Sequence, residues 1–149
     1  MARQVALPSP LASWQPNTPK INVGPGGVIN LNDAPARFLI SQRLQEIVVW
    51  IVTNNSGQPI TVRLTDFQRK NSMSDAKGTA PVQCMRWLAG DTVQVDAGKV
   101  GHLSAFIDPG YRMNGLVDSV SYTIQVRCQA PPAATFADVD YDPDGDIKP

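Results

Sequence analysis

Four aspartates near the end of the chain have a spacing that suits a hard cation. The alternating positions are Asp140, Asp142, Asp144 and Asp146. With Gly145 they form the D-x-D-x-D-G pattern of a calcium loop, in which carboxylates supply oxygen ligands and the glycine permits a sharp turn. The twelfth-position glutamate of such loops is missing, because Pro149 is reached first. Two interpretations follow: a weak Ca²⁺ site, or an acidic tail that turns into a short terminal strand.

Thiols and imidazoles, the softer ligands, are few. The sequence has one histidine, His102, and two cysteines, Cys84 and Cys128, without any Cys-x-x-Cys motif. This excludes a zinc ribbon and a thioredoxin-type site. Two inert core thiols, one Cys84–Cys128 disulfide, and a metal or redox role are the alternatives. His102 shares strand parity with Ser104, opposite Leu103, so we expect the imidazole to point outward.

No nucleophile motif is present. The sequence lacks Gly-x-Ser-x-Gly, Ser-x-x-Lys and His-Glu-x-x-His, so acid–base chemistry would have to use loop carboxylates such as Asp66, Asp108 and Asp118. Gly24–Gly27 lacks the lysine of a phosphate-binding loop and predicts a simple turn. We therefore predict a protein that is not an enzyme, with a hydrolase or isomerase as the weaker alternative.

Composition excludes further classes. Thirteen basic and thirteen acidic residues balance each other, so the chain lacks the basic excess of nucleic-acid binders. No stretch approaches the ~20 apolar residues of a membrane span. The first eight residues have no apolar core of signal-peptide length, so we expect a cytoplasmic protein by default, with a mature secreted domain as the alternative. Near-zero net charge favours self-association, because colloidal repulsion is weak.

The elements that would position these residues are strands. Apolar and polar residues alternate over 60–65, 92–96 and 119–128, which is the period of half-buried strands. The continuous run Ile47–Val52 predicts a central strand. Turn signals at Asn54–Gly57 and Ala97–Gly98 are short enough for hairpins. With 149 residues, this predicts a single all-β domain, a two-sheet Greek-key β-sandwich of about seven strands.

Proline divides the chain. Residues 1–26 are rich in proline and predict an extended N-terminal arm, because proline fixes φ and removes a hydrogen-bond donor. Residues 27–149 would form the sandwich with its acidic C-terminal tail. Trp50 and Trp87 are the expected core anchors, and Trp14 would pack the arm against the domain.

Three segments together resemble a group of uncharacterised bacterial cupredoxin-like domains, whose pattern immunoglobulin-like sandwiches largely share. They are Ile47–Phe67, Val100–Phe106 and Ser121–Arg127, the last followed by Asp142–Asp144 and Ile147–Pro149. The resemblance implies a Greek-key sandwich, in some members with a copper site.

This chain departs from the blue-copper ligand set, which needs two imidazoles, a thiolate and a weak axial ligand such as methionine. It has only His102, Gln68 stands where the first histidine is expected, and no histidine or methionine closely follows Cys128. We therefore predict a non-catalytic interaction or structural module that binds a protein partner or self-assembles. The alternative is a copper- or calcium-binding cupredoxin-like protein, whose candidate soft ligands are His102, Cys84, Cys128, Met85 and Met113.

Overall fold

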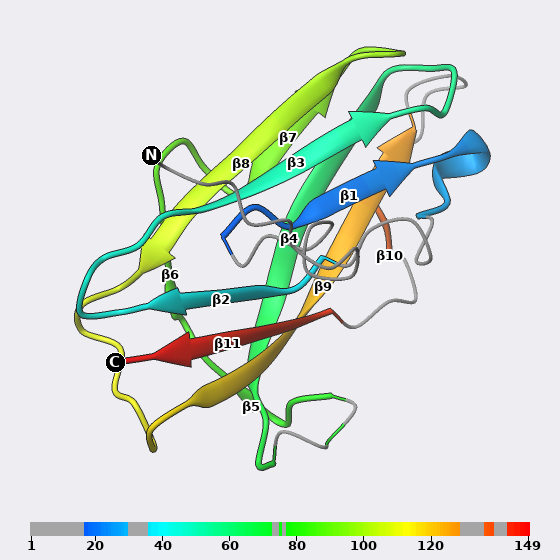
Figure 1. The fold of residues 1–149 in the computed structure, drawn as a ribbon. Coiled ribbons are helices and arrows are strands. Elements are labelled where there is room, and N and C mark those ends of the chain that lie inside the picture. The colour runs from blue at the N-terminus through cyan, green and yellow to red at the C-terminus, as the bar shows by residue number, and fades with distance from the viewer. Residues whose placement is uncertain (1–16, 30–35, 73–74, 76, 129–135, 139–142) are drawn as a thin grey trace, which may run out of the picture.

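Two β-sheets pack against each other in the computed structural model (Figure 1). The structure describes residues 17–29, 36–72, 75, 77–128, 136–138 and 143–149. The four-stranded sheet has the order β1 (Lys20–Val23), β3 (Val48–Asn54), β8 (Val100–Ile107) and β6 (Met85–Trp87). The main path of the seven-stranded sheet is β2 (Phe38–Ser41), β11 (Asp144–Lys148), β9 (Asp118–Cys128), β4 (Ile60–Arg69) and β5 (Ala80–Pro81).

Two short strands complete the second sheet: β7 (Thr92–Val95) pairs with β4, and β10 (Ala137–Asp138) pairs with β9. The predicted all-β sandwich is confirmed. The described residues form eleven strands rather than about seven, because six of them have four residues or fewer. Strands this short carry too little alternation to be recognised from sequence.

The core lies between the two sheets. Strand β3 runs between β1 and β8, which confirms its central position. Only one of its faces is fully buried, since Val48, Trp50 and Val52 are inaccessible and the residues between them are half-buried. The indole Nε1 of Trp50 donates to the Tyr122 hydroxyl at 3.0 Å, and that hydroxyl donates to the carbonyl of Ala36. The largest core side chains are thereby linked by a buried hydrogen-bond chain.

The two predicted hairpin turns connect different sheets instead. Residues 54–57 lead from β3 in one sheet to β4 in the other, and Ala97–Gly98 leads from β7 back to β8. The buried Asn54 holds both connections. Its side-chain Nδ2 donates to the carbonyls of Gln58 (2.7 Å) and Val95 (2.9 Å), and its backbone carbonyl accepts from the Gly98 amide at 2.9 Å.

The predicted arm contains a strand of the sandwich. Strand β1 lies parallel to β3, and its side chains Ile21 and Val23 are completely buried. The ordered sheet therefore begins before residue 27. Gly24–Gly27 forms the expected turn, with Gly26 and Gly27 at φ of 76° and 80°. Trp14 and the rest of residues 1–16 lie outside the described residues.

Within the described part of the chain, no helix has the length and apolar character needed to cross a membrane.

Candidate functional site

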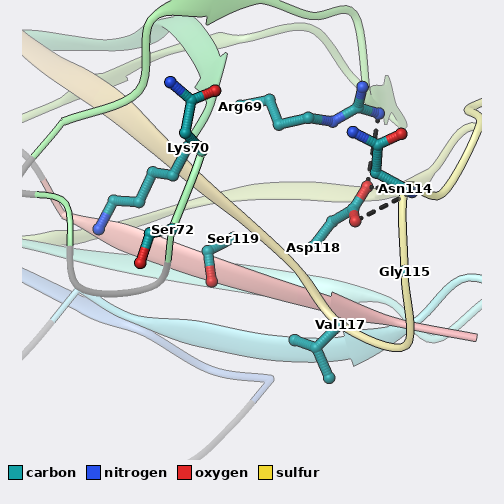
Figure 2. Close-up of a pocket in the computed structure, with 9 residues that line it drawn as sticks. Arg69, Lys70, Ser72, Asn114, Gly115, Val117, Asp118 and Ser119 are labelled. Carbon is teal, nitrogen blue, oxygen red and sulfur yellow. Dashed lines mark hydrogen bonds and ion pairs between the residues drawn. The ribbon is translucent and has the colours of Figure 1, made fainter.

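A small polar pocket of about 210 Å³ lies beside the end of β4 (Figure 2). Its two basic residues are already paired. The Arg69 Nη2 lies 3.4 Å from Asp118 Oδ2, and the Nζ of the buried Lys70 lies 2.6 Å from Asp144 Oδ1. A further anion would have to compete with these carboxylates, so this pocket is a poor binding site.

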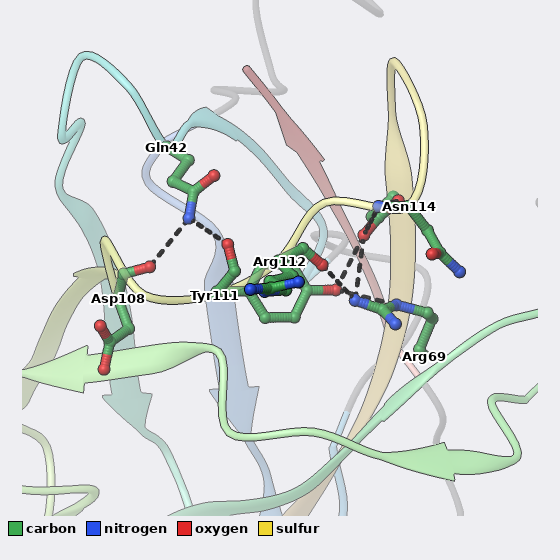
Figure 3. A network of polar contacts seen from close by, with 7 residues as sticks. Gln42, Arg69, Asp108, Tyr111, Arg112 and Asn114 are labelled. Carbon is green, nitrogen blue, oxygen red and sulfur yellow. Dashed lines mark hydrogen bonds and ion pairs between the residues drawn. The ribbon is translucent and has the colours of Figure 1, made fainter.

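Asp118, a candidate carboxylate of the weaker enzyme alternative, is held in a structural network with Arg69, Tyr111 and Asn114, which Figure 3 labels. It accepts hydrogen bonds from the Tyr111 hydroxyl and the Asn114 amide, both at 3.0 Å, besides its contact with Arg69. Burial raises the pKa of Tyr111 to about 12, so the phenol stays protonated and remains a donor. Gln42 Nε2 donates to the Tyr111 carbonyl at 2.6 Å. The network fastens the loop between β8 and β9 to the body of the sandwich.

A larger hollow of about 510 Å³ lies between β4 and β6, and we call it the groove. Ligand pockets typically have this size. Its lining comes from Leu64–Phe67 of β4, from Pro81–Trp87, and from Asp91 and Asp108.

The floor of the groove is apolar. Phe67 and Cys84 are buried, and Trp87 is half-buried. The Trp87 ring lies 5.5 Å from Trp50 and 6.2 Å from Phe67, centroid to centroid, so the floor is continuous with the aromatic core. Trp87 was expected in the core, and the structure instead places it where the core reaches the surface.

Strands β4 and β6 form the walls. On the groove side of β4, β7 pairs with Ile60–Arg63 and β5 pairs with Gln68–Arg69. Between these two pairings the Leu64 amide donates to the Asp91 carbonyl at 3.0 Å, and the Phe67 carbonyl accepts from the Val82 amide at 2.9 Å, so both ends of the gap in β4 are already bonded. Among the described residues β6 pairs only with β8, and an exposed strand edge of this kind can accept another chain.

The bulge in β4 shapes the rim of the groove. The register of β4 against β9 shifts between Thr65 and Gln68, and Asp66 has a φ of 59°. Few residues other than glycine adopt this left-handed conformation, and aspartate is one that tolerates it. β-Bulges redirect a side chain and interrupt pairing, and they are frequent next to binding sites.

The rim is acidic. It carries Asp66, Asp91 and Asp108 against one cation, Arg86. Arg86 Nη2 already lies 3.5 Å from Asp108 Oδ2. The pKa of Asp108 is lowered, first by the hydrogen bond from the Gly110 amide and then by Arg86. Two negative charges remain in excess.

The thiol under the groove is unreactive. Burial raises the pKa of Cys84 to about 12, whereas nucleophilic and metal-binding cysteines need a lowered pKa. Both cysteines are free. Cys128 lies opposite Ile60, four residues along β4 from Leu64, where the groove lining begins, so roughly 13 Å of strand separates it from the groove. A disulfide needs Cα atoms within ~7 Å, and the structure has two separate thiols instead of the bridge.

The remaining predicted ligands do not come together. His102 is exposed on β8, as its parity predicted, and no group of three metal-ligating side chains occurs within the described ranges. Asp144 pairs with Lys70, and Asp146 accepts from the Ser119 hydroxyl at 2.7 Å. Asp140 and Asp142 lie outside the described residues, so the calcium site stays a prediction.

Sequence reasoning did not find the groove. Its lining comes from strand edges that are brought together only when the two sheets pack, and no local sequence motif predicts which edges will be neighbours. The one available signal was Trp87, a large aromatic residue followed directly by the apolar Leu88.

Comparison with known proteins identifies the fold. No family model matches the chain, and no curated protein does either. A chain in the crystal structure of the CsuC–CsuE chaperone–tip adhesion subunit pre-assembly complex, from the archaic chaperone–usher Csu pili of Acinetobacter baumannii, is similar, with a TM-score of 0.52 and 10% identity. The match covers 74% of this chain and 47% of that chain, so this chain spans about half of its length.

A second similar structure is the ASH/PapD-like domain 7 of human CEP192, with a TM-score of 0.45, 9% identity and coverage of 90% and 81%. At 10% identity the likeness to the chain of the CsuC–CsuE complex bears on the fold alone, and the fold is the two-sheet β-sandwich described above.

Proposed function

We propose that this chain is a non-catalytic β-sandwich module that binds a protein partner in the groove between β4 and β6. The observation that carries the proposal is the groove itself: an apolar floor reached by Trp87, beside an edge of β6 that no described strand covers. Surfaces with a buried aromatic residue and a polar rim are typical of protein interfaces.

The chemistry of the groove favours binding over catalysis. Its thiol is held protonated by burial, and the lone imidazole lies on the outer face of β8. The CsuC–CsuE structure is a chaperone–tip adhesion subunit pre-assembly complex, and its similarity to this chain is compatible with a protein-binding role.

We further infer that the sandwich is of the cupredoxin-like kind. The segments that carry the resemblance become β3 with β4, β8 and β9, all main strands of the sandwich. Copper binding gains no support, because no group of three histidine, cysteine or acidic side chains that could hold a metal ion occurs in the described part of the chain.

The test is a selection from a library of random twelve-residue peptides displayed on phage, with the full chain as target. Binders are then measured by calorimetry against Gln83→Trp, which fills the groove, and against Gln94→Trp, a matched change at an exposed position of β7. We expect Gln83→Trp to weaken binding at least tenfold and Gln94→Trp to leave it unchanged. A selection without binders, or binders indifferent to Gln83→Trp, would refute the proposal.

A further inference from the structure

The free edge of β6 exposes a defined set of backbone groups. The Cys84 carbonyl accepts from the Asp108 amide at 2.8 Å, and the Leu88 amide donates to the Ser104 carbonyl at 2.9 Å, so residues 84 and 88 direct their backbone groups toward β8. Backbone groups of alternate residues in a strand point to opposite sides. Met85 and Trp87 therefore direct their N–H and C=O groups away from β8, toward the side on which no described strand pairs with β6.

The same two residues offer side chains as well as backbone. Met85 and Trp87 are half-buried lining residues of the groove, whereas Arg86 between them is exposed. A strand added along β6 would form backbone hydrogen bonds with Met85 and Trp87. Its alternate side chains would cover the apolar floor.

The acidic rim selects the charge of such a strand. Asp66 Oδ1 accepts a long hydrogen bond of 3.4 Å from the side-chain Nε2 of Gln68, and Asp91 accepts from the neighbouring Thr92 hydroxyl at 2.9 Å. Neither contact supplies a positive charge. Complementary charge at an interface rim speeds association and rejects partners of the wrong sign.

Together these observations identify a kind of partner. We propose that the groove takes an extended, basic segment of another protein, which adds to the four-stranded sheet as a new edge strand beside β6 and places lysine or arginine side chains against Asp66 and Asp91. This inference rests on the proposed function of the groove and specifies the chemistry of its occupant.

Three capped ten-residue peptides test the inference on the full chain. The first alternates valine with lysine, the second replaces each lysine with glutamate, and the third is the first with N-methylated central valines, which cannot pair as a strand. We expect the valine–lysine peptide to bind at low salt and to shift the amide resonances of Met85 and Trp87. The other two should bind at least tenfold more weakly.

Protein variants supply a second, independent readout. Asn tolerates the left-handed backbone of Asp66, so Asp66→Asn with Asp91→Asn removes charge without straining the fold. We expect this double variant to bind the valine–lysine peptide about tenfold more weakly, and Asp96→Asn, at an exposed carboxylate remote from the groove lining, to bind it normally.

The outcomes separate the inference from the proposed function. Equal binding of the lysine and glutamate peptides, or undiminished binding after N-methylation, would overturn the basic-strand inference. Either result would still be compatible with protein binding in the groove, provided that Gln83→Trp continues to weaken the library binders. Loss of that weakening would overturn both.

Discussion

Replacing Gly145 with alanine should severely destabilise the sandwich. Gly145 lies in β11 directly opposite Phe38 of the parallel strand β2. A Cβ built on Gly145 would lie within 3.0 Å of three carbons of the Phe38 ring. The ring cannot move aside, because it is buried and packs 5.7 Å from Trp50 and 6.1 Å from Tyr122, centroid to centroid.

The magnitude follows from the packing. Overpacking a rigid core typically costs 1–3 kcal/mol, and a clash with several carbons of a fixed ring belongs at the upper end, about 3 kcal/mol. Domain stability is only ~5–15 kcal/mol, so the loss is easily measured. Urea unfolding followed by tryptophan fluorescence gives the free energy of unfolding directly.

Two further variants separate the Phe38 clash from other effects. Gly115→Ala is the matched control, since a Cβ there meets nothing within 4 Å, and we expect a change of less than about 0.5 kcal/mol. Phe38→Leu should relieve the clash, so the double variant Gly145→Ala/Phe38→Leu should be more stable than the two separate costs predict, by about 2 kcal/mol. Additive costs, or a Gly145→Ala cost below 1 kcal/mol, would refute the packing argument.

The same experiment bears on the calcium pattern. A calcium loop uses this glycine for a sharp turn, whereas Gly145 lies within a strand and is absent from the glycines with positive φ. We expect the Gly145→Ala cost to be equal in calcium and in chelator. A cost that appears only with calcium would instead support a metal role.

Three other measurements test the architecture. Asn54→Ala should lower the free energy of urea unfolding by about 2–3 kcal/mol, because the Gln58 and Val95 carbonyls lose their donor. The control Asn55→Ala, at an exposed position, should cost little. Equal effects would contradict the role of Asn54 in holding the two connections between the sheets. Tyr122→Phe should cost about 1–3 kcal/mol, because the Trp50 Nε1 and the Ala36 carbonyl lose a buried partner, and an unchanged urea midpoint would argue against that chain of bonds. Burial raises the pKa of Cys84 from 9.0 to about 12, so between these pH values the folded state keeps a proton that the unfolded chain releases. The free energy of unfolding should therefore be unaffected by this thiol below pH 9 and fall as the pH rises toward 12. The expected loss at pH 10.5 is about 2 kcal/mol. Tyr111, whose pKa is also raised to about 12, titrates in the same direction, so Cys84→Ala should flatten the slope without abolishing it; an unchanged slope would exclude the thiol as its source.

The sequence specified the long strands well because their alternation spans many residues. Strand β9 repeats the pattern from Val120 to Val126 and was recognised over nearly its whole length. Strand β1 was missed because Pro19 and Pro25 flank it, and the composition of the region obscured four residues between them.

Local sequence patterns could not predict which of the two sheets each strand joins. The Asn54–Gly57 signal reports a reversal of the chain, and it does so whether the next strand pairs beside β3 or crosses to the other layer. What decides the crossing is long-range, including the bond from Asn54 Nδ2 to the Val95 carbonyl. The groove depends on the same long-range arrangement, so it was equally invisible to motif analysis.

The pairing of β2 with β11 has a consequence for biosynthesis. Of the strands that the structure describes, only β11 pairs with β2, and the Ser41 hydroxyl donates to the Pro149 carbonyl, 108 positions later. On a translating ribosome, Phe38–Ser41 must wait for residues 144–148 to leave the exit tunnel before finding a neighbour. Until then the nascent chain exposes the apolar residues of a strand without a partner, and segments of this kind are prone to aggregation during synthesis.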